Sequence, residues 1–457
     1  MQHEETWKQK WTRLWTILWP IIVTQVGMYA MNLVDTMMSG QVGTEDLAGV
    51  AIGSSLWLPV LTGINGILLA VSPVVAQMIG KGEREGTGRF VNQALYVAVV
   101  LSLLVLAAGA AVLGPVLDAM GLEEQVGHVA YHYLLGLAIG IVPLFAANVL
   151  RNFFDAQSLT VVTMWITLSA VPVNALLNYM FIFGKFGAPA MGGIGAGYAT
   201  AATYWLMLAV TIWATFRVEA VRGYRLFVKW AAPSLAAWKE MLAIGIPLGL
   251  SIFFEASIFS VVTLMMGVMF DTLTIAAHQI ALSFASLVFM IPLSISMALT
   301  IVVGYSVGAG RLKDAKQYGM MGVGGGIGFL ACCSVLIYFF REPIAFLYND
   351  DPEVARLAAS FLLVAILYQI SDAAQASLQG VLRGYKDVQK PFFIAFASYW
   401  LIGIPSGYAL ASYTELGPYG FWVGIIIGLT CAAVGFMVRL VQVQRLAAGA
   451  GGRQPST

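Results

Sequence analysis

The chain has 457 residues, of which 59% are hydrophobic and only 10% are charged, and its formal net charge is +1. Soluble domains carry about 25% charged residues, so this composition excludes a soluble globular protein and indicates a chain that crosses a membrane many times. A net charge this close to zero gives no reason to expect a nucleic-acid partner.

Apolar runs of roughly 20 residues between polar breaks predict twelve transmembrane helices. In chain order they cover about 15–39, 52–79, 92–117, 130–152, 161–183, 194–217, 241–267, 278–305, 317–340, 357–382, 392–412 and 419–438. The first run is long and lacks a small-residue cleavage site, so we expect it to remain as a span and not to be a signal peptide. The three cysteines lie in apolar runs without a Cys/His grouping, which argues against disulfides or a zinc site.

The positive residues predict the orientation of these spans. Of the 24 Lys and Arg residues, 21 fall in one alternating set of connections, while the other set holds only Lys185, Arg341 and Arg356. By the positive-inside rule, both termini are cytoplasmic and the chain is a multi-pass protein of the plasma membrane.

The two halves of the sequence resemble each other at an offset of roughly 230 residues. Trp19-Pro20 aligns with Ile246-Pro247, and Val149-Leu150-Arg151-Asn152 aligns with Val381-Leu382-Arg383-Gly384. Six spans separate the copies, so both halves have the same orientation, as in transporters built from parallel repeats. We therefore predict an N-terminal six-helix bundle at 1–217 and a C-terminal six-helix bundle at 241–445. A cytoplasmic linker at 218–240 joins them, and a flexible tail follows at 446–457.

Three carboxylic acids lie well inside predicted spans: Asp35 in the first, Glu255 in the seventh and Asp372 in the tenth. A carboxylate at the centre of a membrane helix costs roughly 2.5 to 3.5 kcal/mol on insertion scales. No Lys or Arg is expected deep in a span, so the partner must be a proton, a metal ion or a cationic substrate. Glu255 and Asp372 both lie near the midplane, and Asp35 lies about one turn from the outer end of its helix.

Neutral polar residues lie on the same helices or near them. We expect Asn174, Asn178, Thr200 and Gln25 to accompany Asp35, and Tyr368 to lie on the same face as Asp372. Helix-to-helix hydrogen bonding is the alternative role for these five residues. Glu255, Asp372 and Tyr368 form a hard oxygen set that suits Na⁺ or a proton better than a transition metal.

Pro20 and Pro247 occupy equivalent positions in the first helix of each half, where each is a candidate bending point. Four histidines without an adjacent carboxylate motif, and no nucleophile beside a base, argue against an enzyme.

In these features the chain resembles the multidrug and toxic compound extrusion (MATE) family, specifically its NorM-like branch. The resemblance rests on Val34-Asp35-Thr36-Met37-Met38-Ser39-Gly40, on Glu255 and Asp372, on Val171-Pro172-Val173-Asn174 with Asn178, and on the glycine-and-basic loops after spans two and eight. It covers nearly the whole chain, and the three acids are specific in combination.

The resemblance implies an all-α membrane protein with two pseudo-symmetric six-helix bundles in a V. It also implies an antiporter that exports cationic and amphipathic drugs or dyes in exchange for inward Na⁺ or H⁺, acting as a monomer among membrane lipids and without a cofactor. It implies a cation site at Glu255, Asp372 and Tyr368, and a protonation site at Asp35, Asn174, Asn178 and Thr200. The alternative is a lipid-linked precursor flippase of the same superfamily, which usually has a more basic cavity.

Overall fold

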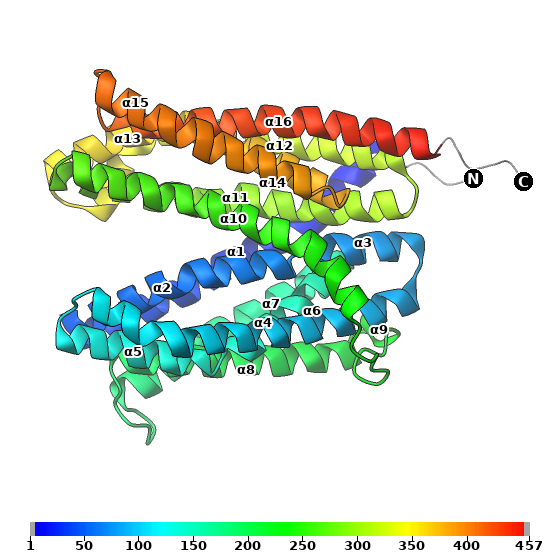
Figure 1. Ribbon diagram of the computed structural model, residues 1–457, viewed down its shortest axis with the longest axis horizontal. Helices are drawn as coiled ribbons and strands as arrows, with labels where there is room; N and C mark the ends of the chain where they lie inside the picture. Colours follow the sequence, from blue (N-terminus) through cyan, green and yellow to red (C-terminus); the bar gives the residue numbers. More distant parts are fainter. Residues whose placement is uncertain (1–4, 452–457) are drawn as a thin grey trace, which may run out of the picture. The chain divides into compact units, whose positions relative to one another are not determined.

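The structure, a computed structural model, describes residues 5–451, and this part of the chain is helical with no β-strand (Figure 1). The elements are, in chain order, α1 (Trp7–Val42), α2 (Thr44–Leu68), α3 (Val71–Lys81), α4 (Arg84–Ala119), α5 (Glu124–Ala138), α6 (Ile141–Ala156), α7 (Thr160–Phe183), α8 (Gly193–Arg217), α9 (Glu219–Arg222), α10 (Leu235–Met269), α11 (Thr272–Gly308), α12 (Leu312–Tyr348), α13 (Pro352–Gly384), α14 (Gln389–Phe396), a π-helix (Ala397–Gly403), α15 (Ile404–Tyr413) and α16 (Tyr419–Gly451).

The predicted spans all have helical counterparts. Among the described residues, eleven helical segments are long and apolar enough to cross a membrane, and α5 with α6 forms a twelfth span that is bent by 51°. The all-α membrane fold predicted from the sequence is therefore confirmed. The predicted tail begins at 446, where α16 is still helical; α16 continues to Gly451, and 452–457 lie outside the described residues.

The bend between α5 and α6 has a local cause. Gly140 separates the two helices, and a Cβ atom at this position would lie 2.6 Å from Cα of Ala201 in α8. Only glycine allows this close approach. Pro143, in the first turn of α6, has no N–H to continue the hydrogen bonding of α5. The span therefore bends where it meets α8.

The chain divides by packing into two compact units. One unit comprises residues 19–249, and the other comprises the described residues up to Leu18 together with 250–451. The bundles predicted from the sequence repeat, 1–217 and 241–445, remain a prediction. Helices α1 and α10 each run through the division, which falls within two residues of Pro20 in α1 and of Pro247 in α10.

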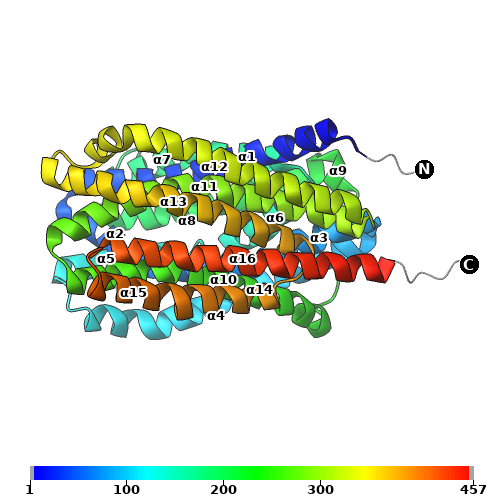
Figure 2. The ribbon, with the colours of Figure 1, turned by 90° about the horizontal axis from the view of Figure 1, so that it is seen from above.

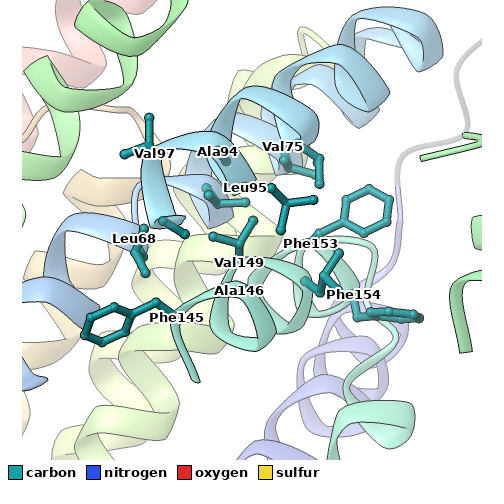
Figure 3. Packing of buried hydrophobic residues seen from close by; sticks show 14 of the residues in the cluster. Leu68, Val75, Ala94, Leu95, Val97, Phe145, Ala146, Val149, Phe153 and Phe154 are labelled. Atoms are coloured by element: carbon teal, nitrogen blue, oxygen red, sulfur yellow. The ribbon is translucent and has the colours of Figure 1, made fainter. Parts of the chain in front are cut away.

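The core of the unit 19–249 lies where α2, α3, α4 and α6 meet, and α6 carries much of it. Phe145, Val149 and Phe153 of α6 are completely buried and face Leu95 of α4 and Val75 of α3 (Figure 3). Lipid tails are as apolar as these side chains, so close van der Waals packing holds the helices together. This packing fixes α6, which lines the cavity described below.

In the other unit, α13 packs closely on α11. A Cβ atom at Gly380 of α13 would lie 2.4 Å from the carbonyl oxygen of Ser296 in α11, and the Gly380 carbonyl accepts a hydrogen bond from Thr300 Oγ1 at 3.0 Å. Small residues let membrane helices approach in this way. Helix α16 lies alongside α15 in both views (Figures 1 and 2) and also packs on α13 and on the π-helix. Together α11 and α16 hold the face of α13 that carries Asp372.

Candidate functional site

Asp35 lies in α1 and is 8% exposed. Asn178 of α7 donates a hydrogen bond from Nδ2 to Oδ1 of Asp35 at 2.5 Å, and Thr200 of α8 donates from Oγ1 to Oδ2 at 2.7 Å. Asn178 Nδ2 also donates to Oδ1 of Asn174, one turn away, at 3.2 Å. The structure thus brings together the four residues that were predicted to form the N-terminal site.

The Asp35 carboxylate faces a cavity of about 240 Å³ inside the unit 19–249. Polar groups from several helices line it together with Asp35, namely Asn32, Ser54, Tyr133, Asn148, Asn174, Thr200, Thr203 and Tyr204. Ser54 and Tyr133 lie 3.3 Å apart through their hydroxyl oxygens. Arg151 and three more threonines also line it, and the remaining wall is mainly apolar, so the cavity combines one acid and one arginine with a largely hydrophobic surface.

One buried atom at this site has no partner. Asn178 uses Nδ2 for both of its hydrogen bonds, and its Oδ1 is buried without a hydrogen-bond partner. A buried carbonyl oxygen without a donor costs free energy. The site therefore holds one unused hydrogen-bond acceptor in the amide that donates to Asp35.

Gln25 does not join this site. It lies ten residues before Asp35 in α1, which corresponds to about 15 Å along a helix, and it is not among the residues that line the cavity. It is half-buried and has an interaction of its own elsewhere.

A second site forms around Glu255 of α10 and Asp372 of α13. Gln375 of α13 donates from Nε2 to Oε1 of Glu255 and to Oδ1 of Asp372, both at 2.9 Å. One amide nitrogen thus bridges the two carboxylates, which lie close together. Asp372 is 3% exposed and Gln375 is completely buried.

The hydroxyl of Tyr399 donates to Oε1 of Gln375 at 2.9 Å, which turns the amide nitrogen toward the carboxylates. Tyr399 belongs to the π-helix Ala397–Gly403, and π-helical turns often occur at functional sites. The sequence interpretation missed both Gln375 and Tyr399. The available signal was the position of Gln375, three residues after Asp372 and hence on its helix face.

Tyr368 lies on α13 one turn before Asp372, as predicted, and is buried. Its ring contacts those of Phe259 and Trp422 edge-on, with centroids 6.0 and 5.7 Å away. Among the hydrogen bonds between described residues, none joins Tyr368 to Glu255 or Asp372. Gln375, and not Tyr368, donates hydrogen bonds to the two carboxylates.

The second site offers carboxylate oxygens and an amide but no larger ligand cluster. Within residues 5–451, no three His, Cys, Asp or Glu side chains come together in an arrangement that could hold a metal ion. The carboxylate oxygens of Glu255 and Asp372 are hard ligands, which fit a proton or a monovalent cation better than a transition metal.

Arg151 and Arg383, which the distribution of Lys and Arg assigned to cytoplasmic connections, instead lie within helices: Arg383 is buried and Arg151 is partly buried. Arg383 of α13 is 3% exposed and donates to Ser296 Oγ at 3.2 Å, while its Nε and Nη1 have no hydrogen-bond partner. Arg151 of α6 lines the Asp35 cavity, and its Nε lies 3.7 Å from Asp155 Oδ2. Arg151 is the last charged residue of the predicted span 130–152, and Arg383 lies just beyond the predicted span 357–382, one residue before the end of α13. The Arg151 charge is balanced by Asp155, so it leaves no free cation for Asp35.

The sequence and the structure were compared with known proteins. The family model described as MatE matches the chain twice, over residues 20–180 and 247–409. The two matches begin at Pro20 and Pro247, which supports the internal repeat inferred from the sequence.

Curated relatives match along nearly the whole chain. A probable multidrug resistance protein NorM of Halalkalibacterium halodurans is 50% identical over 445 residues, which cover 97% of each chain. A protein with the same description from Oceanobacillus iheyensis is 49% identical over 97% of this chain and 99% of the relative.

Solved structures of the same fold include a eukaryotic MATE transporter, with a TM-score of 0.84 and 24% identity over 97% of this chain and 99% of that one. Another is the outward-facing conformation of a multidrug resistance MATE family transporter, with a TM-score of 0.86 and 19% identity over 95% of this chain and 96% of that one. The family model covers well over half of the chain, and the curated relatives share about half of its residues. The chain therefore belongs to the MatE family of membrane transporters.

Proposed function

We propose that this chain is a multidrug efflux antiporter, which exports organic cations in exchange for inward H⁺ or Na⁺. One observation carries the proposal: the carboxylates of Asp35, Glu255 and Asp372 have only neutral hydrogen-bond partners within the described residues. These partners are Asn178 and Thr200 for Asp35, and Gln375 for Glu255 and Asp372. The Arg383 guanidinium attracts Glu255 electrostatically but forms no ion pair with it. A carboxylate in apolar surroundings without a paired cation is costly, so each site gains free energy when it takes up a cation or a proton.

At the first site, Asp35 binds the proton. The Asn178 and Thr200 donors stabilise the charged carboxylate, and the unpartnered Oδ1 of Asn178 can accept a hydrogen bond when the carboxyl is neutral. The apolar wall of the 240 Å³ cavity suits the hydrophobic part of an organic cation, and Asp35 attracts its charge. Drug and proton thus compete for one negative charge, and this competition couples their movements.

At the second site, Glu255 and Asp372 share a proton or a Na⁺ ion. The Gln375 amide holds the two carboxylates close together, which makes the doubly charged state expensive. Uptake of one cation removes much of that repulsion. This site therefore adds a second step at which ion binding changes the relative free energies of the transporter's states.

Alternating access requires α1 and α10 to change shape, because both helices run from one compact unit into the other. We place the bending points at Pro20 and Pro247, close to the division between the units. The orientation with both termini in the cytoplasm, the location in the plasma membrane and action as a monomer belong to the same proposal. They rest on the distribution of Lys and Arg and on the resemblance to the family.

The experiment is dye efflux from proteoliposomes that contain the purified full-length protein. A Na⁺ gradient and a pH gradient are imposed separately, with ethidium as the reporter substrate. Efflux under at least one gradient, and none without a gradient, supports antiport. Full gradient-driven efflux by the triple variant Asp35→Asn, Glu255→Gln, Asp372→Asn would overturn the proposal.

A further inference from the structure

The segment between α8 and α10 carries a cluster of positive charge. A hollow of about 590 Å³ within the unit 19–249 is lined by Arg84 and Arg89 of α4 and by Arg225 and Lys229 of this segment. A neighbouring hollow of about 360 Å³ shares Arg225 and adds Arg222. We call these five residues the basic cluster. All five are exposed at the surface.

The basic cluster carries far more positive than negative charge among the described residues. No ion pair between described residues involves any of its five members, and Glu85 is the single acidic residue that lines the larger hollow. Five like charges repel each other unless an anion neutralises them. The cluster therefore has an excess of positive charge, which an anion from outside the protein can offset.

The segment that carries the cluster is held in place. Three polar side chains of α4 donate to its backbone: Asn92 to the Lys229 carbonyl at 3.0 Å, Gln93 to Ala232 at 2.7 Å and Tyr96 to Ala231 at 3.0 Å. Gln93 Oε1 also accepts from the backbone N–H of Ser234 and from Nε1 of Trp238, both at 2.9 Å. Arg225 and Lys229 are thus presented by a fixed loop beside Arg84 and Arg89, which preorganises the hollow for a ligand.

Large apolar side chains border the cluster and are exposed. Phe216, at the end of α8, is 46% exposed, Val228 is 66% exposed and Trp230 is 50% exposed. The hollow lies beside the end of α8 and the first turns of α4, on the side where the Lys and Arg pattern predicts the cytoplasm. Tryptophan at the end of a membrane span lies at the level of the lipid headgroups. The surroundings of the cluster thus suit acyl chains next to an anionic group.

We propose that the basic cluster binds the headgroup of an anionic phospholipid on the cytoplasmic side of the membrane. The phosphodiester receives charge-assisted hydrogen bonds from Arg84, Arg225 and Lys229, since guanidinium groups fit phosphate oxygens in pairs. Phe216, Val228 and Trp230 contact the upper part of the acyl chains. The bound lipid offsets part of the positive charge of the cluster and anchors the segment between the two halves. This site is separate from Asp35, Glu255 and Asp372, so it does not depend on the proposed coupling mechanism.

The test measures lipid binding to the full-length protein in a neutral detergent by native mass spectrometry. The probes are dioleoyl phosphatidylglycerol, dioleoyl phosphatidylcholine and inorganic phosphate. The site variant carries Arg84→Gln, Arg225→Gln and Lys229→Gln. The control variant carries Lys316→Gln, Lys390→Gln and Arg445→Gln, which removes three other exposed positive charges.

The wild type is expected to bind phosphatidylglycerol more tightly than phosphatidylcholine. Each Lys or Arg near an anionic surface contributes about a fivefold gain in affinity, so the site variant should bind phosphatidylglycerol on the order of a hundredfold more weakly. The control variant should bind it like the wild type. Equal losses in both variants, no preference for phosphatidylglycerol, or full displacement of the lipid by millimolar phosphate would each overturn the proposal.

The three substitutions are on the surface, but a folding defect is checked independently. Wild-type binding of phosphatidylglycerol is also followed as the salt concentration rises, because ionic contacts between exposed groups weaken with screening. An affinity that falls steeply as the salt concentration rises from roughly 50 to roughly 500 mM supports the headgroup site. Affinity that does not change with salt contradicts it without the use of any variant.

Discussion

Nζ of Lys10 in α1 lies 2.6 Å from Oδ1 of Asp314 in α12, and the two side chains are only 2% and 6% exposed. Lys10 also donates to Gln317, and Arg311 lies 3.5 Å from the other carboxylate oxygen of Asp314. The first turns of α1 are thus fixed to α12 by a buried ion pair. The rest of α1 beyond Leu18 belongs to the other compact unit. Helix α1 is therefore one of the two helices that run from one unit into the other, and this ion pair holds its first turns.

Removal of one partner of this pair is expected to destabilise the protein. Asp314→Leu leaves the Lys10 ammonium buried without a carboxylate, which costs about 3 kcal/mol or more. The double variant Lys10→Met, Asp314→Leu replaces both charges by apolar groups and should recover most of that loss. Thermal unfolding in detergent, followed by tryptophan fluorescence, gives the comparison. A double variant that melts no higher than Asp314→Leu would contradict the pairing.

Glu5, just before α1, extends the same network. It accepts from Arg13 at 2.9 Å and from the Tyr318 hydroxyl at 2.6 Å, and Arg311 lies 3.7 Å away. Burial raises the pKa of Glu5, but the Tyr318 hydrogen bond and the charges of Arg13 and Arg311 outweigh burial, so the pKa lies below its ordinary value of 4.5.

A carboxylate with a lowered pKa stabilises the folded state above the pKa of the unfolded chain, and this contribution disappears as the pH falls through the lowered value. The melting temperature of the wild type should therefore fall more between about pH 5 and pH 3 than that of Glu5→Gln. Equal slopes for the two proteins over this interval would show that the Glu5 contacts contribute nothing to stability.

Asp35 is expected to be essential for coupled efflux, and Asn178 is expected to influence the pH dependence of efflux. Asp35→Asn keeps the shape of the side chain but removes the charge, so pH-driven ethidium efflux should fall to background. Asn178→Ala removes one donor to Asp35, a hydrogen bond to a charged group worth about 2 kcal/mol, and should shift the pH dependence of efflux. Asp118→Asn, an exposed acid in α4, is the matched control and should transport like the wild type.

The N-terminal site was predictable because most of its residues can be recognised from their positions in the sequence. Asp35 is the single acid within its span, and Asn174 and Asn178 are one turn apart on α7, so one helix face had to present both amides. Thr200 was grouped with them as a polar residue of the sixth span, and the family resemblance implied the same site. Gln25 was wrongly grouped with them because a shared helix face does not imply a shared depth: ten residues correspond to about 15 Å.

Gln375 and Tyr399 at the C-terminal site were not predictable in the same way. Glutamine and tyrosine are common enough in membrane helices that neither Gln375 nor Tyr399 stood out beside two carboxylates. The π-helix Ala397–Gly403 changes the direction of the side chains around Tyr399, and no hydrophobic period signals such a turn. The 51° bend between α5 and α6 depends on contact of Gly140 with α8, which is a tertiary and not a local property.

Pro20 is expected to matter for the rate of transport more than for drug binding. Pro20 lies in α1 beside the division between the two units, and its ring removes one backbone hydrogen bond from the helix. Pro20→Ala restores that bond and stiffens α1, so the efflux rate should fall several-fold while the ethidium dissociation constant stays the same. Pro115→Ala, in α4, is the control and should leave the rate unchanged. A parallel loss of binding would assign Pro20 to the drug site instead.

Gln375 is expected to govern how tightly the two C-terminal carboxylates are linked. Gln375→Leu removes the donor to both Glu255 and Asp372, so the initial efflux rate should fall at least tenfold, since two hydrogen bonds to charged groups are lost. Tyr399→Phe removes only the bond that orients the amide, a loss of about 1 kcal/mol, and should lower the rate about fivefold. The rates are measured in proteoliposomes against Na⁺ concentration at fixed pH and against pH at fixed Na⁺. A larger effect of Tyr399→Phe than of Gln375→Leu would show that the tyrosine, and not the amide, controls the two acids.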